Sequence, residues 1–244
     1  MNLKRGLTEE IRRAEAVAQG KDSKFETNYA TRYMFAWQNQ LILNALSAKT
    51  GPLLEIGAGI GNFLVDAVTN VKDIHATEVG ANTARIAQTR TPTVNSISLA
   101  PAEHLPFKSN SFETIVARGV LHHLEDPTKG IEEMYRVLHP GGRLIVFEGN
   151  PASTYRKLVL SIADQFGIEH EVSQYEHLLP AEIRRLLARF TQVECKSVSG
   201  FLAPISYAGL GGPVLWKTLQ SLQDVLYRWR PDGFSWWLLW TAQK

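Results

Sequence analysis

The segment 53–61, which reads LLEIGAGIG, constrains the fold of this 244-residue chain more than any other feature. A short apolar run precedes Gly57, Gly59 and Gly61, and an apolar helical pattern follows them. This order predicts a strand, a tight turn and a helix. Glycines in such a turn let a ligand lie directly against the backbone, where a Cβ atom would block it. The segment therefore predicts an α/β fold with a ligand site at the end of its first strand.

Strand-like and helical segments alternate after this turn. Further strands are expected at 72–77, 93–99, 112–117 and 143–148, and helices at 62–68, 81–90 and 128–138. The sequence His139-Pro140-Gly141-Gly142 is expected to end the last of these helices. Alternation at this pitch is typical of a parallel sheet that helices cover on both faces.

The segments on either side of this pattern predict helical additions to a single sheet domain. Residues 1–50 are expected to form a helical lead-in and cap, 51–199 the core, 200–233 a helical insertion, and 234–244 the final strand of the core. Within the insertion, apolar residues recur at helical spacing and form one stripe, namely Leu215, Leu219, Leu222, Leu226 and Trp229. This stripe predicts a helix with a broad apolar face.

Composition excludes several classes of protein. With 44% hydrophobic and 20% charged residues, the chain has the composition of a globular protein. A net charge of +2 gives no electrostatic footprint for nucleic acid, so none is expected as a partner. The single cysteine, Cys195, can form neither an intrachain disulfide nor a cysteine zinc cluster. The charged N-terminal sequence is unlike a signal peptide, so a cytoplasmic location is expected.

The identity of the ligand can be narrowed from the residues around the glycine turn. A dinucleotide-binding G-x-G-x-x-G turn would have glycine at position 62, where the chain has Asn62. A phosphate-binding loop would need Gly-Lys-Ser/Thr, which does not follow. Glu55 would repel a pyrophosphate and suits a ligand with positive charge. Glu78 ends the second predicted strand, where its carboxylate can accept hydrogen bonds from both hydroxyls of a ribose.

Five motifs in this order carry a family resemblance. They are the Glu55-x-Gly57-x-Gly59-x-Gly61 turn, the acidic Glu78, the segment AEHLPF at 102–107, the segment SFETIVARGVLHHLEDP at 111–127 and the segment RVLHPGGRLIV at 136–146. The chain resembles the class I methyltransferases that use S-adenosylmethionine, and is similar to the small-molecule "type 11" methyltransferase domain. The resemblance covers about residues 51–151. It implies a Rossmann-like, seven-stranded, mostly parallel sheet with helices on both faces and an antiparallel last strand.

The resemblance also implies roles for the residues of the first two motifs. The turn of Gly57, Gly59 and Gly61, with Glu55 before it, would pass along the methionine part of S-adenosylmethionine. Glu78 would hold the ribose. The product would be S-adenosylhomocysteine, and no metal is expected.

The remaining cofactor contacts implied by the resemblance come from loops. Backbone near Ala102, together with Glu103, would lie along the edge of the adenine ring. Arg118 would lie near the cofactor and the mouth of the substrate site. The hydroxyl of Tyr29, on a segment folded over the cofactor, would lie near its carboxylate. Pro101 departs from the family, which often has Asp there, so adenine recognition is expected to use other groups.

Methyl transfer from a sulfonium is an in-line displacement, in which an enzyme mainly contributes proximity and alignment. A base is needed only when the acceptor must lose a proton. His122 and His123 follow the fourth predicted strand and are the candidate bases, with a role in shaping the loop as the alternative. Substrate contacts are expected from Tyr33, Glu148, Asn150, His170 and Tyr175.

The expected acceptor is a small, partly hydrophobic metabolite that is methylated on oxygen, nitrogen or carbon. Two alternatives stay open, namely a methyltransferase that acts on RNA or protein, and a non-catalytic cofactor-binding protein with an assembly or regulatory role. The segment 214–230 is interpreted as a substrate lid, a peripheral membrane contact or a homodimer interface. The sequence does not decide among these three.

Overall fold

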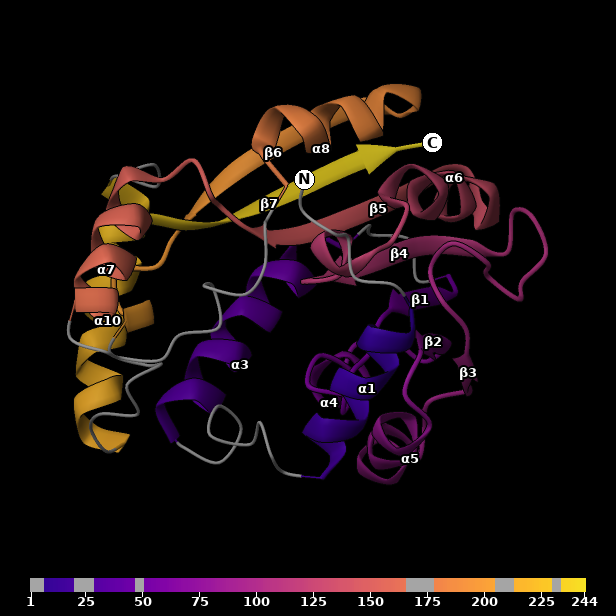
Figure 1. Ribbon diagram of the computed structural model, residues 1–244, viewed down its shortest axis with the longest axis horizontal. Helices are drawn as coiled ribbons and strands as arrows, with labels where there is room; N and C mark the ends of the chain where they lie inside the picture. Colours follow the sequence, from indigo (N-terminus) through magenta and orange to yellow (C-terminus); the bar gives the residue numbers. More distant parts are fainter. Residues whose placement is uncertain (1–6, 20–28, 47–50, 166–177, 205–212, 230–233) are drawn as a thin grey trace.

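The computed structural model describes residues 7–19, 29–46, 51–165, 178–204, 213–229 and 234–244. Within these ranges, seven strands form one sheet in the order β3-β2-β1-β4-β5-β7-β6 (Figure 1). The strands are β1 (Leu53–Ile56), β2 (Ile74–Glu78), β3 (Ser96–Leu99), β4 (Phe112–Arg118), β5 (Leu138–Gly149), β6 (Thr191–Ser199) and β7 (Ser235–Gln243). Strands β1 to β5 are parallel, and β7 runs antiparallel between β5 and β6. The predicted sheet, with its antiparallel last strand, is confirmed.

Helices cover both faces of this sheet. They are α1 (Leu7–Ala18), α3 (Tyr29–Asn44), α4 (Leu64–Ala67), α5 (Ala81–Arg90), α6 (Pro127–Val137), α7 (Thr154–Gln165), α8 (Pro180–Leu186) and α10 (Pro213–Trp229), with 3-10 turns η1 (Leu121–His123) and η3 (Leu187–Arg189). In β4, Val116 packs in the same cluster as residues of α3 and α4, whereas Ile115 and Ala117 join residues of α6 and α8. Because alternate strand residues face opposite sides, a strand covered on both faces is mainly apolar, as residues 115–117 are.

Helix α6 fixes the loop that follows β3. Asp126 caps the helix by accepting from the backbone N–H groups of its first turn, next to Pro127 at the first helical position. Arg136, in the last turn, donates to the carbonyl oxygens of Leu105 (3.1 Å) and Phe107 (2.8 Å). Its hydrogen bond to Glu133 holds the pKa of that carboxyl below its ordinary value. The motif 102–107 is therefore held at a defined position beside the sheet.

Strand β5 begins earlier than the sequence predicts. Leu138 already pairs with Phe112 in β4, and the regular register resumes only at Arg143, so residues 139–142 form an excursion within the strand. The Pro-Gly-Gly run ends α6, as predicted. The backbone N–H of Gly141 donates to the carbonyl oxygen of Lys244 at 2.9 Å, and the N–H of Lys244 donates to the carbonyl oxygen of Gly142 at 3.0 Å. These two bonds hold the excursion in place. A contact with a residue so distant in sequence could not be read from the local pattern.

The buried face of α10 is not the stripe that the spacing predicts. Leu215, Leu222 and Trp229 are exposed, whereas Trp216 and Gln223 are fully or almost fully buried. The polar side chains of α10 determine which side of the helix faces the core, because buried hydrogen-bonding groups need partners. Leu215, Leu222 and Trp229 of the predicted stripe therefore lie on the outer side of the helix, and the packed side carries Trp216 and Gln223.

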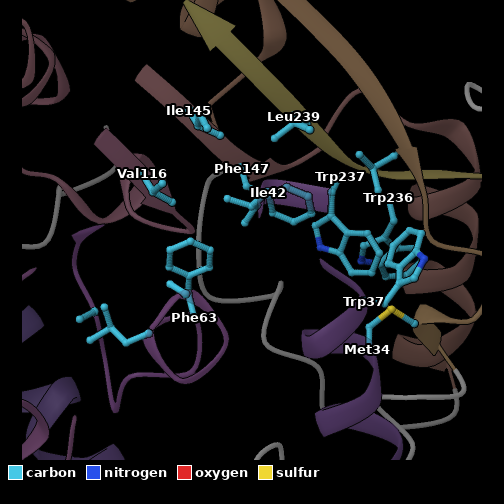
Figure 2. Packing of buried hydrophobic residues seen from close by; sticks show 14 of the residues in the cluster. Met34, Trp37, Ile42, Phe63, Val116, Ile145, Phe147, Trp236, Trp237 and Leu239 are labelled. Atoms are coloured by element: carbon cyan, nitrogen blue, oxygen red, sulfur yellow. The ribbon is translucent and has the colours of Figure 1, made fainter. Parts of the chain in front are cut away.

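Aromatic side chains from distant segments fill the core between the sheet and α3 (Figure 2). Trp37 of α3 lies against Trp237 of β7, with ring centroids 6.4 Å apart, and Trp237 lies against Trp236 and Phe147. Trp216 of α10 belongs to the same cluster. The tryptophans after residue 200 are thus mainly core residues.

Candidate cofactor and acceptor site

A cavity of about 530 Å³ opens at the carboxyl ends of β1, β2 and β4. Its described lining comes from the glycine turn, the end of β2, the loop 100–104, the turn after β4 and the start of α6, with Ala14 of α1 and Thr83 of α5 at its margin. The volume is that of a site for a small molecule. The carboxyl ends of parallel strands are also where open α/β sheets bind ligands.

The three glycines of the turn have different tasks. All three adopt positive φ angles, of 67° at Gly57, 56° at Gly59 and 84° at Gly61. A Cβ atom at Gly57 would lie 2.8 Å from Val120, and one at Gly61 would lie 3.3 Å from Ala87 in α5. A Cβ atom at Gly59 would meet no atom within 4 Å and would point into open space. Gly57 and Gly61 allow close packing, whereas Gly59 keeps backbone accessible beside the cavity.

These differences predict opposite results for two alanine variants. Gly59→Ala should weaken the binding of S-adenosylhomocysteine about tenfold, because its methyl group occupies space beside the turn. Both positions have a positive φ angle, so both variants should lose some stability. Gly57→Ala should lower the free energy of unfolding by about 1–3 kcal/mol more, through contact of its methyl group with Val120. Isothermal titration calorimetry and urea denaturation separate the two effects. Equal ligand affinity in the Gly59→Ala variant and the wild type would contradict this division of tasks.

Glu78 lies where a ribose hydroxyl could reach it. Its Oε2 accepts from the backbone N–H of Gly59 (2.7 Å), and its Oε1 accepts from those of Val79 (2.8 Å) and Gly80 (3.0 Å). The side chain is almost fully buried and lines the cavity. An ionised carboxylate has about four acceptor positions, so these three bonds leave capacity for a ligand hydroxyl. The same bonds attach the end of β2 to the glycine turn.

Glu55 is a buried carboxyl group beside this turn, although it is not part of the cavity lining. Its Oε2 has no hydrogen-bond partner. Burial raises the pKa of Glu55 from 4.5 to about 8, the charge of Arg118 lowers it and the charge of Glu78 raises it further. A group with such a pKa gains most from a positive charge brought near it, because the charge replaces the missing solvation.

The adenine side of the predicted site also lies in the cavity. Ala102 and Glu103 both line it, together with Asp126. Glu103 accepts a 3.2 Å hydrogen bond from the backbone N–H of Asp126, which ties the loop after β3 to the start of α6. No motif in the sequence points to Ala14, which also lines the cavity. The predicted N-terminal helix contains this residue, but a helix without a motif does not indicate which part of the sheet it covers.

A carboxylate and an imidazole meet beside the cavity. His122 of η1 donates from Nδ1 to Oε2 of Glu148 at 2.6 Å, and Glu148 Oε1 accepts from the backbone N–H of Leu121 at 2.7 Å. Glu148 ends β5 and is buried, and the His122 side chain is only 9% exposed. The ring of His123, which lines the cavity, lies 4.0 Å from that of His122. Two anchors on one carboxylate fix the orientation of the His122 ring.

Some predicted residues lie elsewhere. Arg118 ends β4 and places its guanidinium 5.0 Å from the ring of Phe35 in α3. Tyr33 lies against Trp216, with ring centroids 6.1 Å apart. Asn150 donates to Ser235 Oγ at 2.9 Å and accepts from the backbone N–H of Ala152 at 3.1 Å, so its amide joins β5 to β7. Substrate contacts by Tyr33 and Asn150 stay predictions.

Three predicted residues have no described side-chain environment. Tyr29 begins α3, but its side chain is outside the described part of the structure, and His170 and Tyr175 lie wholly outside the described residues. Among the described residues, no group of three or more His, Cys, Asp or Glu side chains is placed to hold a metal ion. No helix in the described ranges is long and apolar enough to cross a membrane.

Comparison with known proteins gives one family. Residues 54–146 match the family model described as a methyltransferase domain. A demethylmenaquinone methyltransferase of Chlamydia trachomatis is 33% identical over 128 residues, which are 51% of this chain and 55% of that protein. The chain thus spans about half the length of this relative.

Solved structures with the same fold cover much more of the chain. A methyltransferase of Thermotoga maritima, described as S-adenosylmethionine-dependent and a possible histamine N-methyltransferase, has a TM-score of 0.65 at 19% identity and covers 95% of this chain and 97% of its own. Geranyl diphosphate C-methyltransferase of Streptomyces coelicolor, in complex with S-adenosylhomocysteine, has a TM-score of 0.59 at 17% identity and covers 85% of this chain and 75% of its own. The segment 54–146 is therefore similar to a methyltransferase domain, and the chain shares its fold with these two solved methyltransferase structures.

Proposed function

We propose that this protein transfers a methyl group from S-adenosylmethionine to a small, partly apolar acceptor. The observation that carries the proposal is the cavity in which the open backbone at Gly59 and the carboxylate of Glu78 lie together. The match of residues 54–146 to the methyltransferase domain supports it.

The residues around the cavity fit this cofactor. Gly59 leaves the space that a Cβ atom would fill, and Glu78 retains an acceptor position for a ribose hydroxyl. Glu55 has an oxygen without a partner, and its raised pKa suits a ligand that brings positive charge. When bound, S-adenosylmethionine supplies a methyl group on a positively charged sulfur.

His122 is the proposed base for an acceptor that must lose a proton. Because its Nδ1–H donates to Glu148, the other ring nitrogen, Nε2, is the one that can take a proton from an acceptor hydroxyl. Glu148 then stabilises the positively charged ring. His123 lines the cavity beside it and is proposed to shape the acceptor site. Glu148, expected from the sequence as a substrate contact, is thus proposed as the residue that positions His122.

The acceptor is proposed to be small for two reasons. The relative from Chlamydia trachomatis is named for demethylmenaquinone, and the Streptomyces coelicolor neighbour is named for geranyl diphosphate. Both names support a metabolite as the acceptor, in place of RNA or protein. RNA has less support, because a net charge of +2 gives no basic surface for phosphates.

The cofactor assignment can be tested at Glu78. Glu78→Gln should weaken the binding of S-adenosylhomocysteine about tenfold, because an amide replaces one acceptor oxygen by a donor. Glu194→Gln is the matched control, since Glu194 is exposed on β6, at the other end of the sheet. Binding is measured by calorimetry, and methyl transfer with labelled S-adenosylmethionine and a panel of small phenols and quinols. Wild-type affinity in the Glu78→Gln variant would refute the ribose assignment. Cofactor binding without transfer to any acceptor would favour the non-catalytic alternative.

A further inference from the structure

The outer face of α10 exposes five large apolar side chains, with the small polar residues Thr218 and Ser221 between them. Val214, Leu215, Leu222, Val225 and Trp229 are 81%, 47%, 45%, 61% and 75% exposed. With 3.6 residues per turn, these five positions fall within an arc of roughly 100°. We call this row the apolar ridge. Isolated exposed apolar residues are ordinary, but a row along one helix marks an interaction surface.

Hydrogen bonds on the opposite side of α10 fix the direction of the ridge. Gln223 Oε1 accepts from the backbone N–H of Leu202 at 3.1 Å, and Asp224 Oδ1 accepts from Nε1 of Trp37 at 3.1 Å. Trp216, on this inner side, is fully buried. A small rotation of the helix would break these contacts, so the ridge does not fold inward to complete the core.

The charges beside the ridge have one sign. Lys217 and Arg228 are exposed and lie along one margin of it. Asp224 is the one acidic residue of α10 within its bounds, and it is turned toward Trp37. The helix therefore presents apolar and basic groups to the outside, while its carboxylate is used within the fold. This is the pattern of an amphipathic helix that lies in the surface of an anionic membrane.

A second helix extends the exposed apolar surface at this end of the molecule. In α7, Leu158 and Ile162 are 59% and 45% exposed and lie one helical turn apart. Tyr155 of α7 donates to the carbonyl oxygen of Phe201 at 3.1 Å, and the neighbouring Leu202 is held by α10. The two helices thus adjoin the same short segment, and Figure 1 places both at one end of the sheet.

We propose that the apolar ridge of α10 docks on the surface of an anionic lipid membrane. The apolar side chains enter the boundary between headgroups and acyl chains, Trp229 lies at headgroup level, and Lys217 and Arg228 contact anionic headgroups. A symmetric dimer through the ridge fits less well, because it would bring the basic margins of two copies together without acidic partners. The proposal does not depend on methyl transfer.

Co-sedimentation of the full chain with vesicles tests the proposal. Vesicles of phosphatidylcholine and phosphatidylglycerol should bind the protein, and pure phosphatidylcholine should bind it more weakly. Val225→Asp should weaken binding to the mixed vesicles about tenfold. Lys217→Glu with Arg228→Glu should remove the preference for anionic lipid. These positions are exposed, and urea denaturation of each variant verifies that it folds as the wild type does.

Leu99→Asp is the matched control. Leu99 is 61% exposed, as Val225 is, but it lies on β3, at the far edge of the sheet from β6. This variant makes the same change in charge and should bind vesicles like the wild type. An equal loss of vesicle binding in Val225→Asp and Leu99→Asp would show that the effect comes from net charge alone, and would overturn the proposal. Sedimentation velocity supplies the other decisive result: a wild-type dimer that Val225→Asp converts to a monomer, without vesicle binding, would make the ridge a subunit interface.

Discussion

Replacement of His122 by glutamine is expected to lower the turnover number of methyl transfer about 10²- to 10⁴-fold, the usual contribution of a positioned base. The affinity for S-adenosylhomocysteine should stay unchanged, because the proposed role of His122 is to take a proton from the acceptor and not to hold the cofactor. The measurement uses labelled S-adenosylmethionine with the best acceptor of the panel, and it reports kcat and KM separately. The expected change is in kcat.

Glu148 provides the sharper test of the same pair. Glu148→Gln should lower kcat because the 2.6 Å bond to Nδ1 of His122 loses its charge. If the carboxylate acts only through the imidazole, the double variant should be no slower than His122→Gln alone, since residues that act as one unit are not additive. His123→Gln serves as the comparison, and a small effect on kcat is expected from it. Full additivity of the two losses would separate Glu148 from His122 and contradict the proposed dyad.

The second large effect is expected from Glu55 through pH. Its pKa of about 8 in the folded chain exceeds the ordinary value of 4.5, so the folded chain keeps a proton that the unfolded chain loses between these values. The free energy of unfolding should therefore fall as pH rises from 6 to 8, by up to about 1.4 kcal/mol per pH unit. Glu55→Gln carries no titrating group and should remove this dependence. Urea denaturation at both pH values measures it, with Glu194→Gln as the control.

The same proton affects ligand binding in the opposite direction. A positively charged ligand favours the ionised form of Glu55, so the affinity for S-adenosylmethionine should rise with pH, by at most about tenfold per pH unit between pH 6 and 7.5. S-adenosylhomocysteine, whose sulfur is uncharged, should respond less. Glu55→Gln should abolish the difference between the two ligands. If the wild-type affinities for the two ligands changed equally with pH, an interaction between Glu55 and the charged sulfur would be refuted.

Local pattern and motif spacing predicted the sheet, and they predicted which residues lie at the carboxyl ends of its strands. The glycine turn, Glu78, Ala102 and Glu103 lie in one chain segment, and their order fixes which strand ends they occupy. Strand β1, which leads into the glycine turn, is buried along its whole length and is apolar apart from Glu55. The positions of these residues therefore followed from the order of strands and helices.

Contacts between distant segments could not be predicted in this way. The bond between His122 and Glu148 joins the ends of β4 and β5, and a sequence gives no distance between two strand ends. The rotation of α10 depends on Leu202 and Trp37, which lie outside the helix. Hydrophobic spacing predicts which faces of a helix are apolar. When two faces are apolar, the spacing does not predict which of them is buried.

The order of strands at the C-terminal edge has a consequence for how the chain is made. Strand β7 lies between β5 and β6, although it is the last of the three to be synthesised. During translation β6 has no partner in the sheet until residues 235–243 leave the ribosome, and β5 presents an open edge for about 90 residues of further elongation. A nascent chain of this topology depends on completing its last strand, so a stop before residue 235 would leave two unpaired strand edges for a chaperone or a protease to recognise.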